Sequence, residues 1–104
     1  MVTLPDTITH SIQRFLNAVR QEQRIAAAFL YGSQVKGTAS EWSDIDVAII
    51  SPDFSADLLQ EQLKLMRLAA QIDDRIEPRP YRPIDFDAGE PLVSEIKRTG
   101  IKIA

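Results

Sequence analysis

The sequence predicts an α/β (α+β) fold in which a small mixed sheet is flanked by helices. The order of its segments supports this class. Short apolar or β-branched runs alternate along the chain with longer segments whose apolar residues recur every three or four positions. The chain has 104 residues, the size of one ordinary domain, so we expect residues 1–104 to form a single domain.

The first half of the chain predicts a helix followed by two strands. Asp6 or Thr7 can cap the helix, and its apolar positions then follow helical spacing; they are Ile8, Ile12, Phe15, Leu16 and Val19. Residues 25–31 (IAAAFLY) are typical of a short buried strand, although their three alanines suit a helix equally well. The polar stretch that follows is expected to hold a short helix from Ser33, and residues 44–50 (DIDVAII) are the clearest strand.

The second half predicts a helix over residues 55–73 and a third strand over residues 75–81. Pro78 and Pro80 cannot donate to a β-ladder, which favours a position at the edge of the sheet. A final helix over residues 91–99 begins with proline and is followed by glycine, and a short strand closes the chain.

The helix over residues 55–73 is apolar around much of its circumference. One stripe spans roughly 60° at about 100° per residue and is sufficient to pack the helix on its own sheet; it consists of Leu59, Leu63, Met66 and Ala70. Leu58, Leu65, Ala69 and Ile72 extend the apolar arc, and Leu68 lies about opposite Leu59. We therefore predict that this helix meets a partner chain, either another copy or a different protein. The alternative is that the first or last helix covers its second side.

Composition excludes several classes of protein. The net charge of −3 and the pI of about 5.0 argue against a broad nucleic-acid-binding surface. The chain has no cysteine, which excludes disulfides, thiolate nucleophiles and Cys-ligated zinc. No apolar run approaches the ~20 residues needed to cross a bilayer, so no membrane partner is expected. The first residues lack a basic and apolar leader pattern, and a cytoplasmic location is therefore expected.

Asp44 and Asp46 lie two residues apart on the clearest strand, so both carboxylates point to the same face. Such a pair repels by roughly 4 kcal/mol at 4 Å with an effective dielectric of about 20. Hard divalent cations with oxygen ligands relieve that repulsion. A solvated strand end is the commoner reason for an isolated pattern of this kind, so the pair alone decides little. Trp42, just before this strand, is expected to pack the turn, with stacking on a base as the alternative.

Gly32 and Ser33 directly follow an apolar strand and precede a helical turn. Glycine allows close approach of the backbone, and N–H groups at a helix N-terminus suit a phosphate. The Ser33 hydroxyl and the Lys36 ammonium can serve the same phosphates; a turn glycine without a ligand is the alternative. Gly32 and Gly37 also match part of a P-loop, but Thr38-Ala39 stand where a P-loop needs lysine and then serine or threonine, which excludes that motif.

Residues 32–50 (GSQVKGTASEWSDIDVAII) combine Gly-Ser, a second glycine and Ser-Asp-Ile-Asp in that order. In this order the segment resembles the minimal nucleotidyltransferase (MNT) group of the DNA polymerase β-like nucleotidyltransferase superfamily. The local resemblance runs from about Phe29 to Ile50 and extends more weakly across most of the chain. It implies that residues 1–104 form a single nucleotidyltransferase domain. Gln34 and Lys36 depart from it, because relatives often have arginines there, which would weaken triphosphate binding without abolishing it.

The resemblance implies three carboxylates that hold two Mg²⁺ ions, with Mn²⁺ as an alternative, and a nucleoside triphosphate, ATP, as substrate. Asp44 and Asp46 match the first two positions. Glu77, in the third predicted strand, fits the third position best. Its rivals are expected to be turn or loop residues, and they are Asp73, Asp74, Asp85 and Asp87. The family's phosphate-binding role falls on Gly32, Ser33 and Lys36.

The resemblance also implies the reaction: transfer of NMP, here AMP from ATP, to a hydroxyl on a partner macromolecule. Proteins of this group often resemble antitoxins that neutralise a helical HEPN-domain toxin, in some systems by adenylylating a tyrosine. The competing prediction is a non-catalytic binding module that uses the same fold to neutralise its partner sterically. The three acidic residues argue for the enzyme, because a pure binder does not need converging carboxylates.

Overall fold

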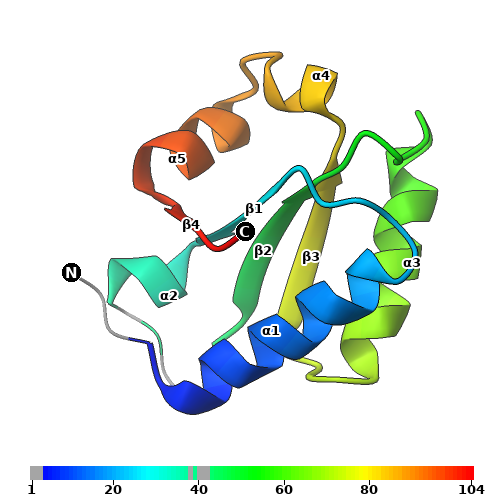
Figure 1. Ribbon diagram of the computed structural model, residues 1–104. Coiled ribbons are helices and arrows are strands. Elements are labelled where there is room, and N and C mark those ends of the chain that lie inside the picture. The colour runs from blue at the N-terminus through cyan, green and yellow to red at the C-terminus, as the bar shows by residue number, and fades with distance from the viewer. Residues whose placement is uncertain (1–3, 38, 40–42) are drawn as a thin grey trace.

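A computed structural model describes residues 4–37, 39 and 43–104 and confirms the predicted α/β class; Trp42 lies outside the described residues. The elements follow one another as α1 (Asp6–Arg20), β1 (Ala27–Tyr31), α2 (Ser33–Lys36), β2 (Ile45–Ile50), α3 (Leu58–Ala70), β3 (Ile76–Tyr81), α4 (Pro83–Phe86), α5 (Pro91–Thr99) and β4 (Ile101–Lys102). Figure 1 shows a central sheet with helices around it. No helix in the described part of the chain has both the length and the apolar content needed to cross a membrane.

The sheet is mixed, as predicted, and its strand order is β3-β2-β1-β4. Strand β1 runs antiparallel to β2 and β4, whereas β2 and β3 are parallel and connected through α3. The register places Tyr31 opposite Asp46, and Asp46 opposite Glu77. Because directly opposed residues share a face of a sheet, these three side chains lie side by side on one face.

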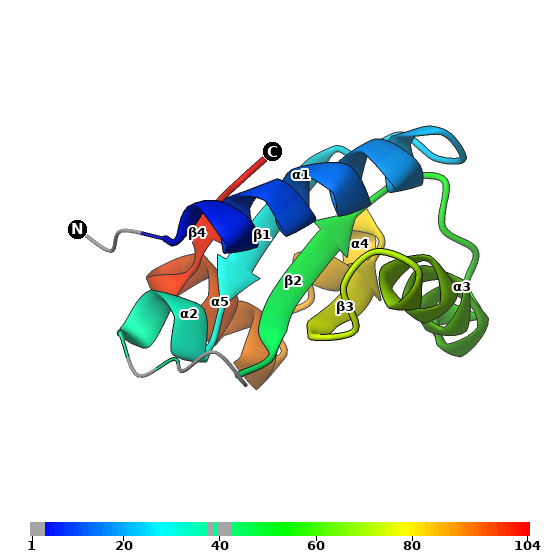
Figure 2. The ribbon, with the colours of Figure 1, turned by 90° about the horizontal axis from the view of Figure 1, so that it is seen from below.

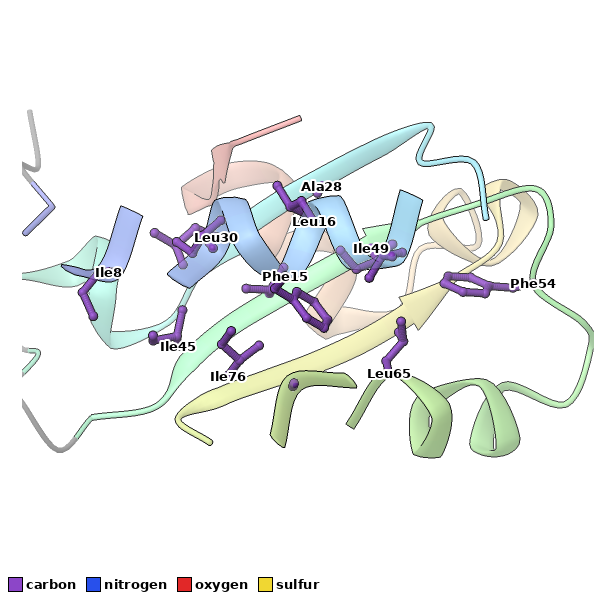
Figure 3. Packing of buried hydrophobic residues seen from close by; sticks show 14 residues of the cluster. Ile8, Phe15, Leu16, Ala28, Leu30, Ile45, Ile49, Phe54, Leu65 and Ile76 are labelled. Atoms are coloured by element: carbon purple, nitrogen blue, oxygen red, sulfur yellow. The ribbon is translucent and has the colours of Figure 1, made fainter. Parts of the chain in front are cut away.

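The two faces of the sheet bury different helices. Figure 2 shows α1 over one face, α4 and α5 over the other, and α3 beside β3. The five apolar positions predicted for the first helix are all buried, and Figure 3 shows several of them packed against side chains from β1, β2 and β3. A second apolar cluster on the opposite face consists of Tyr31, Ala48, Ile50, Tyr81, Phe86, Val93 and Ile96. Asp46 on β2 and Glu77 on β3 come just before the residues of this second cluster along their strands.

Strand β3 lies at the edge of the sheet, as its two prolines predicted. An edge strand needs backbone donors on one side only, so Pro78 and Pro80 interrupt no central ladder. Helix α3 packs along this strand, and Gln62 Nε2 donates to the Pro78 carbonyl oxygen at 3.3 Å. This contact fixes one side of α3 against β3.

The predicted orientation of the long helix was wrong. The stripe expected to face the sheet is largely exposed, with Leu59 at 67%, Leu63 at 39% and Met66 at 43%. Leu65 is buried instead, and Leu68, expected to face outward, packs against the core. Both sets are apolar, so leucine spacing did not distinguish them. Arg67 lies roughly 160–180° around the helix from Leu58, Leu65 and Ala69 at about 100° per residue and stays in solvent, although Glu61 is buried.

Two further details differ from the prediction. The long helix is shorter than residues 55–73 because the Asp57 side chain caps it, accepting from the Gln60 N–H at 3.2 Å. Asp85, expected in a loop, belongs to α4, where its carboxylate accepts from the backbone N–H and side chain of Arg82. A single helical turn of four residues has too few apolar positions to show a period, so the sequence pattern could not reveal it.

Candidate active site

A pocket of about 240 Å³ lies at the end of the sheet where β1 ends and β2 and β3 begin. It brings together the three carboxylates singled out in the sequence, which are Asp44, Asp46 and Glu77. The remaining lining residues are Tyr31, Gln62, Pro78 and Arg79. Asp44 directly precedes β2, Asp46 lies on β2 and Glu77 lies on β3; the parallel register places Glu77 opposite Asp46 and so forms one acidic pocket.

The described residues give the pocket more negative than positive charge, since three carboxylates and one guanidinium, that of Arg79, line it. Within the described chain, no lysine, arginine or histidine lies at ion-pair distance from Asp44, Asp46 or Glu77. Burial raises the pKa of the Asp46 carboxyl above its ordinary value, and the charges of Asp44 and Glu77 raise it further. Arg79 opposes that shift only in part.

Tyr31 and Arg79 both line this pocket. Burial raises the pKa of the Tyr31 hydroxyl, and the neighbouring Arg79 guanidinium counteracts that effect. The Arg79 guanidinium therefore lies near both the phenol and the acidic residues. A positive group in this position can meet an anionic substrate while the carboxylates stay available for other ligands.

The donor set of the pocket suits a hard divalent cation. All three side chains offer carboxylate oxygens, the ligands that Mg²⁺ prefers. The described His, Asp and Glu side chains nevertheless form no group of three arranged as a finished metal site. Asp44 and Glu77 are exposed and free to change rotamer, and mutual repulsion favours separated carboxylates. The metal-bridging arrangement expected from the sequence thus requires side-chain rotation and stays a prediction.

Gly32 adjoins Asp46 at the end of β1. Its backbone has φ of 78°, in the left-handed region, and a Cβ added there would overlap the Asp46 carboxylate. The next turn is α2, whose buried Gln34 donates from Nε2 to the Asp44 carbonyl oxygen at 3.3 Å. Gln34, which replaces an arginine of the family pattern, therefore ties α2 to the start of the acidic strand.

Ser33 and Lys36 do not line the acidic pocket. Ser33 is the first residue of α2, next to Gly32. Lys36 ends that helix, and its Nζ lies 3.1 Å from Glu95 Oε1 of α5, an ion pair between two largely exposed side chains. The phosphate-binding role of Gly32, Ser33 and Lys36 stays a prediction.

The rival carboxylate Asp73 has a structural partner. Its side chain accepts from Ser11 at 2.8 Å and from the Arg75 guanidinium at 2.7 Å, which connects the end of α3 to α1 and to the start of β3. The hydrogen bonds from Arg75 lower the pKa of the Asp73 carboxyl well below its ordinary range. Asp73 is therefore the turn residue that the sequence predicted, and it does not line the acidic pocket.

Sequence reasoning missed Tyr31, Gln62 and Arg79 as pocket residues. The sequence holds signals that could have identified Tyr31 and Arg79. Arg79 lies two residues after Glu77 and so shares its face of β3, and Tyr31 immediately precedes Gly32. Gln62 carries no such signal, because its position depends on which face of α3 turns toward the sheet.

The chain belongs to the family of proteins with a nucleotidyltransferase domain, whose model matches residues 12–101. This agrees with the resemblance to minimal nucleotidyltransferases seen in residues 32–50. No curated protein matches the chain.

Two solved structures share the fold. A chain from a crystal structure of a toxin–antitoxin with AMP-PNP is 19% identical and superposes with a TM-score of 0.63, over 89% of this chain and 69% of its own. A proposed nucleotidyltransferase from Sulfolobus solfataricus is 13% identical, with a TM-score of 0.56 over 98% of this chain and 89% of its own. At these identities the likeness concerns the fold, and the fold is that of nucleotidyltransferases.

Proposed function

We propose that residues 1–104 form one catalytic domain that transfers AMP from ATP to a hydroxyl group on a partner macromolecule. The observation that carries the proposal is the acidic pocket, in which three carboxylates meet at two parallel strands without an ion pair to any described residue. A fold retains such repulsion where a cationic ligand belongs. Asp44, Asp46 and Glu77 would hold two Mg²⁺ ions, with Mn²⁺ as an alternative.

The bound ions would lower the pKa of the acceptor hydroxyl and stabilise the charge of the leaving pyrophosphate. The acceptor oxygen forms a bond to the α-phosphorus while the bond from that phosphorus to the bridging oxygen of pyrophosphate breaks. Glu77 accepts the proton of the hydroxyl. Gly32 lets the triphosphate approach the backbone beside Asp46, the Ser33 hydroxyl donates to it, and Lys36 exchanges Glu95 for a phosphate.

The biological role that fits this reaction is that of an antitoxin. The structural neighbour from a toxin–antitoxin complex with AMP-PNP supports a nucleotide and a protein partner. We propose a helical HEPN-type toxin as that partner and the cytoplasm as the location. The second candidate is a binding module that blocks its partner sterically. The exposed apolar side chains of α3 favour it as far as partner binding is concerned, but they give no reason for the acidic pocket.

The two candidates differ in whether label from ATP reaches the partner. The chain is purified with whatever partner co-purifies from its native host and is incubated with Mg²⁺ and ATP labelled at either the α- or the γ-phosphate. Transfer of AMP labels the partner from α-labelled ATP only, and one pyrophosphate is released for each label incorporated. A partner that is neutralised without label, with or without bound ATP, contradicts the enzyme and supports the binding module.

A further inference from the structure

A second cleft adjoins the acidic pocket on its β3 side. It has a volume of about 250 Å³ and lies between α3 and β3, with Glu90 at its side. Its other lining residues are Leu58, Leu59, Gln62, Arg79, Pro80 and Tyr81. Gln62 and Arg79 line both hollows, so the two hollows are neighbours. Tyr81 is only 5% exposed, and its buried hydroxyl has no hydrogen-bond partner in the described part of the chain. The cleft therefore combines apolar walls with unused hydrogen-bonding capacity.

The strand order places this cleft opposite the glycine turn. Gly32 follows β1, Arg79 belongs to β3, and Asp46 lies between them on β2. In phosphoryl transfer the attacking and leaving oxygens lie roughly in line on opposite sides of the phosphorus. With the pyrophosphate held on the β1 side, the attacking hydroxyl has to come from the β3 side, where the cleft is.

The outer face of α3 presents an exposed apolar stripe that begins at the mouth of the cleft. Leu59, Leu63 and Met66 are 67%, 39% and 43% exposed, and Leu59 also lines the cleft. Figures 1 and 2 show α3 as the outermost element beside β3, without another described element on its outer side. Apolar exposure of this kind marks an interaction surface when it is continuous with a functional site.

The charges of α3 indicate the chemistry of its partner. Lys64 and Arg67 are exposed, whereas the acidic residue of this helix, Glu61, is 5% exposed and lies 3.7 Å from Lys64. Lys64 and Arg67 therefore give the Leu63 and Met66 part of the surface a positive margin, whereas Asp57 and Glu90 place negative charge at its cleft end. The electrostatic complement of the Leu63 and Met66 part is an apolar patch with an acidic margin.

We propose that the cleft between α3 and β3 is the acceptor subsite, which receives a hydroxyl-bearing side chain of a protein. That protein docks an apolar patch with an acidic margin on Leu59, Leu63 and Met66. The inference rests on the proposed function, because it assigns the route by which the acceptor oxygen reaches the α-phosphorus. Arg79 and Tyr81 orient the entering side chain through hydrogen bonds, and its hydroxyl passes from the cleft to the carboxylates.

The test compares labelling of protein with binding of nucleotide. The chain is added with Mg²⁺ and α-labelled ATP to a soluble extract of its native host, and labelled proteins are separated and counted. L59E and M66E should each lower the label by about tenfold or more, the loss typical of a central interface residue. The matched control is I84E, which places the same charge at an apolar residue 71% exposed on α4, and it should label as the wild type does. L59Q and M66Q, which add no charge, guard against misfolding of the glutamate variants.

Calorimetry on each purified variant measures the binding of ATP with Mg²⁺. This measurement separates a failure of the acceptor subsite from a failure of the proposed function. The inference is supported when L59E and M66E bind ATP as the wild type does and lose protein label. Undiminished label in both variants overturns the acceptor subsite and leaves the proposed function intact. A wild type that binds ATP but labels no protein excludes a protein acceptor and overturns the inference. A wild type that neither binds ATP nor labels anything contradicts the proposed function itself.

Discussion

Asp46 and Asp73 are both partly buried carboxylates next to β3, yet their surroundings shift their pKa values in opposite directions. Asp73 accepts hydrogen bonds from Arg75 and Ser11, and its pKa is lowered. Asp46 has neighbours of like charge, no ion pair among the described residues and a raised pKa. Arginine therefore stabilises the carboxylate that connects helices, while the carboxylates of the pocket repel one another. Repulsion that folding leaves uncompensated is the electrostatic signature of a ligand site.

The largest difference between the two carboxylates should appear in catalysis. D46N should lower AMP transfer by about 10³-fold, because each loss of 1.36 kcal/mol in the transition state costs a factor of ten and a metal-ion site contributes several kcal/mol. D73N changes the same functional group outside the pocket and should retain transfer. Rates of pyrophosphate release measure both variants. Equal losses in D46N and D73N would show that the pocket has no special role.

A smaller effect should separate the two glycines that flank α2. Gly32 has φ 78° and ψ −146°, and Gly37 has φ 74° and ψ 14°, so alanine is strained at both, by about 1–3 kcal/mol, and the strain is greater at Gly32. Only at Gly32 would the added Cβ overlap Asp46; at Gly37 it meets no described atom within 4 Å. G32A should therefore lower transfer by roughly 10–100-fold more than G37A, the range for residues that orient a site. Equal activity of the two variants at equal stability would contradict the role of Gly32.

The smallest effect should be on stability, with opposite signs in the two regions. The folded pKa of Asp73 is lowered, so its contribution is present above the unfolded value of about 3.9 and is lost as the pH falls below it. The folded pKa of Asp46 is raised, so its ionisation costs stability as the pH rises above about 3.9. At pH 7, D73N should lower the free energy of unfolding by about 1–2 kcal/mol, and D46N should raise it.

Urea denaturation with a chelator present measures these stability changes at pH 7 and again at about pH 3, where the unfolded carboxyls are protonated. The gain from D46N should disappear at the lower pH, and the loss from D73N should shrink. A D46N variant that is less stable than the wild type at pH 7 would mean that Asp46 has a stabilising partner in the fold.

The sequence predicted the acidic strand better than it predicted the long helix. Alternation along residues 44–50 predicts a common face for Asp44 and Asp46, and the family pattern selects Glu77 on the neighbouring strand. The register places Glu77 opposite Asp46, and all three line one pocket. Helix α3 offered apolar residues on nearly every side, so spacing alone chose the wrong stripe. Weighing Arg67 as a residue that has to stay in solvent selects the observed face, because charge is more costly to bury than leucine is to expose.

The contact between Gly32 and Asp46 was beyond sequence reasoning. Glycine in a turn between two strands indicates backbone freedom, and that much was predicted. Position 32 requires glycine for a second reason, which is that the Asp46 carboxylate occupies the space a Cβ would take. That contact depends on the antiparallel register that places Tyr31 opposite Asp46. Pairings between strands are set by the whole sheet, so a local motif cannot reveal them.

The central claim is that the acidic pocket binds ATP together with divalent metal ions, and thermal unfolding tests it most directly. ATP with Mg²⁺ at 100 times its dissociation constant should stabilise the wild type by about 2.7 kcal/mol, because the ligand binds only the folded chain. The melting temperature should therefore rise by roughly 10 °C for a domain of this size. The D44N/D46N double variant should fold and show no such rise. An equal rise in the double variant, or none in the wild type, would contradict the claim.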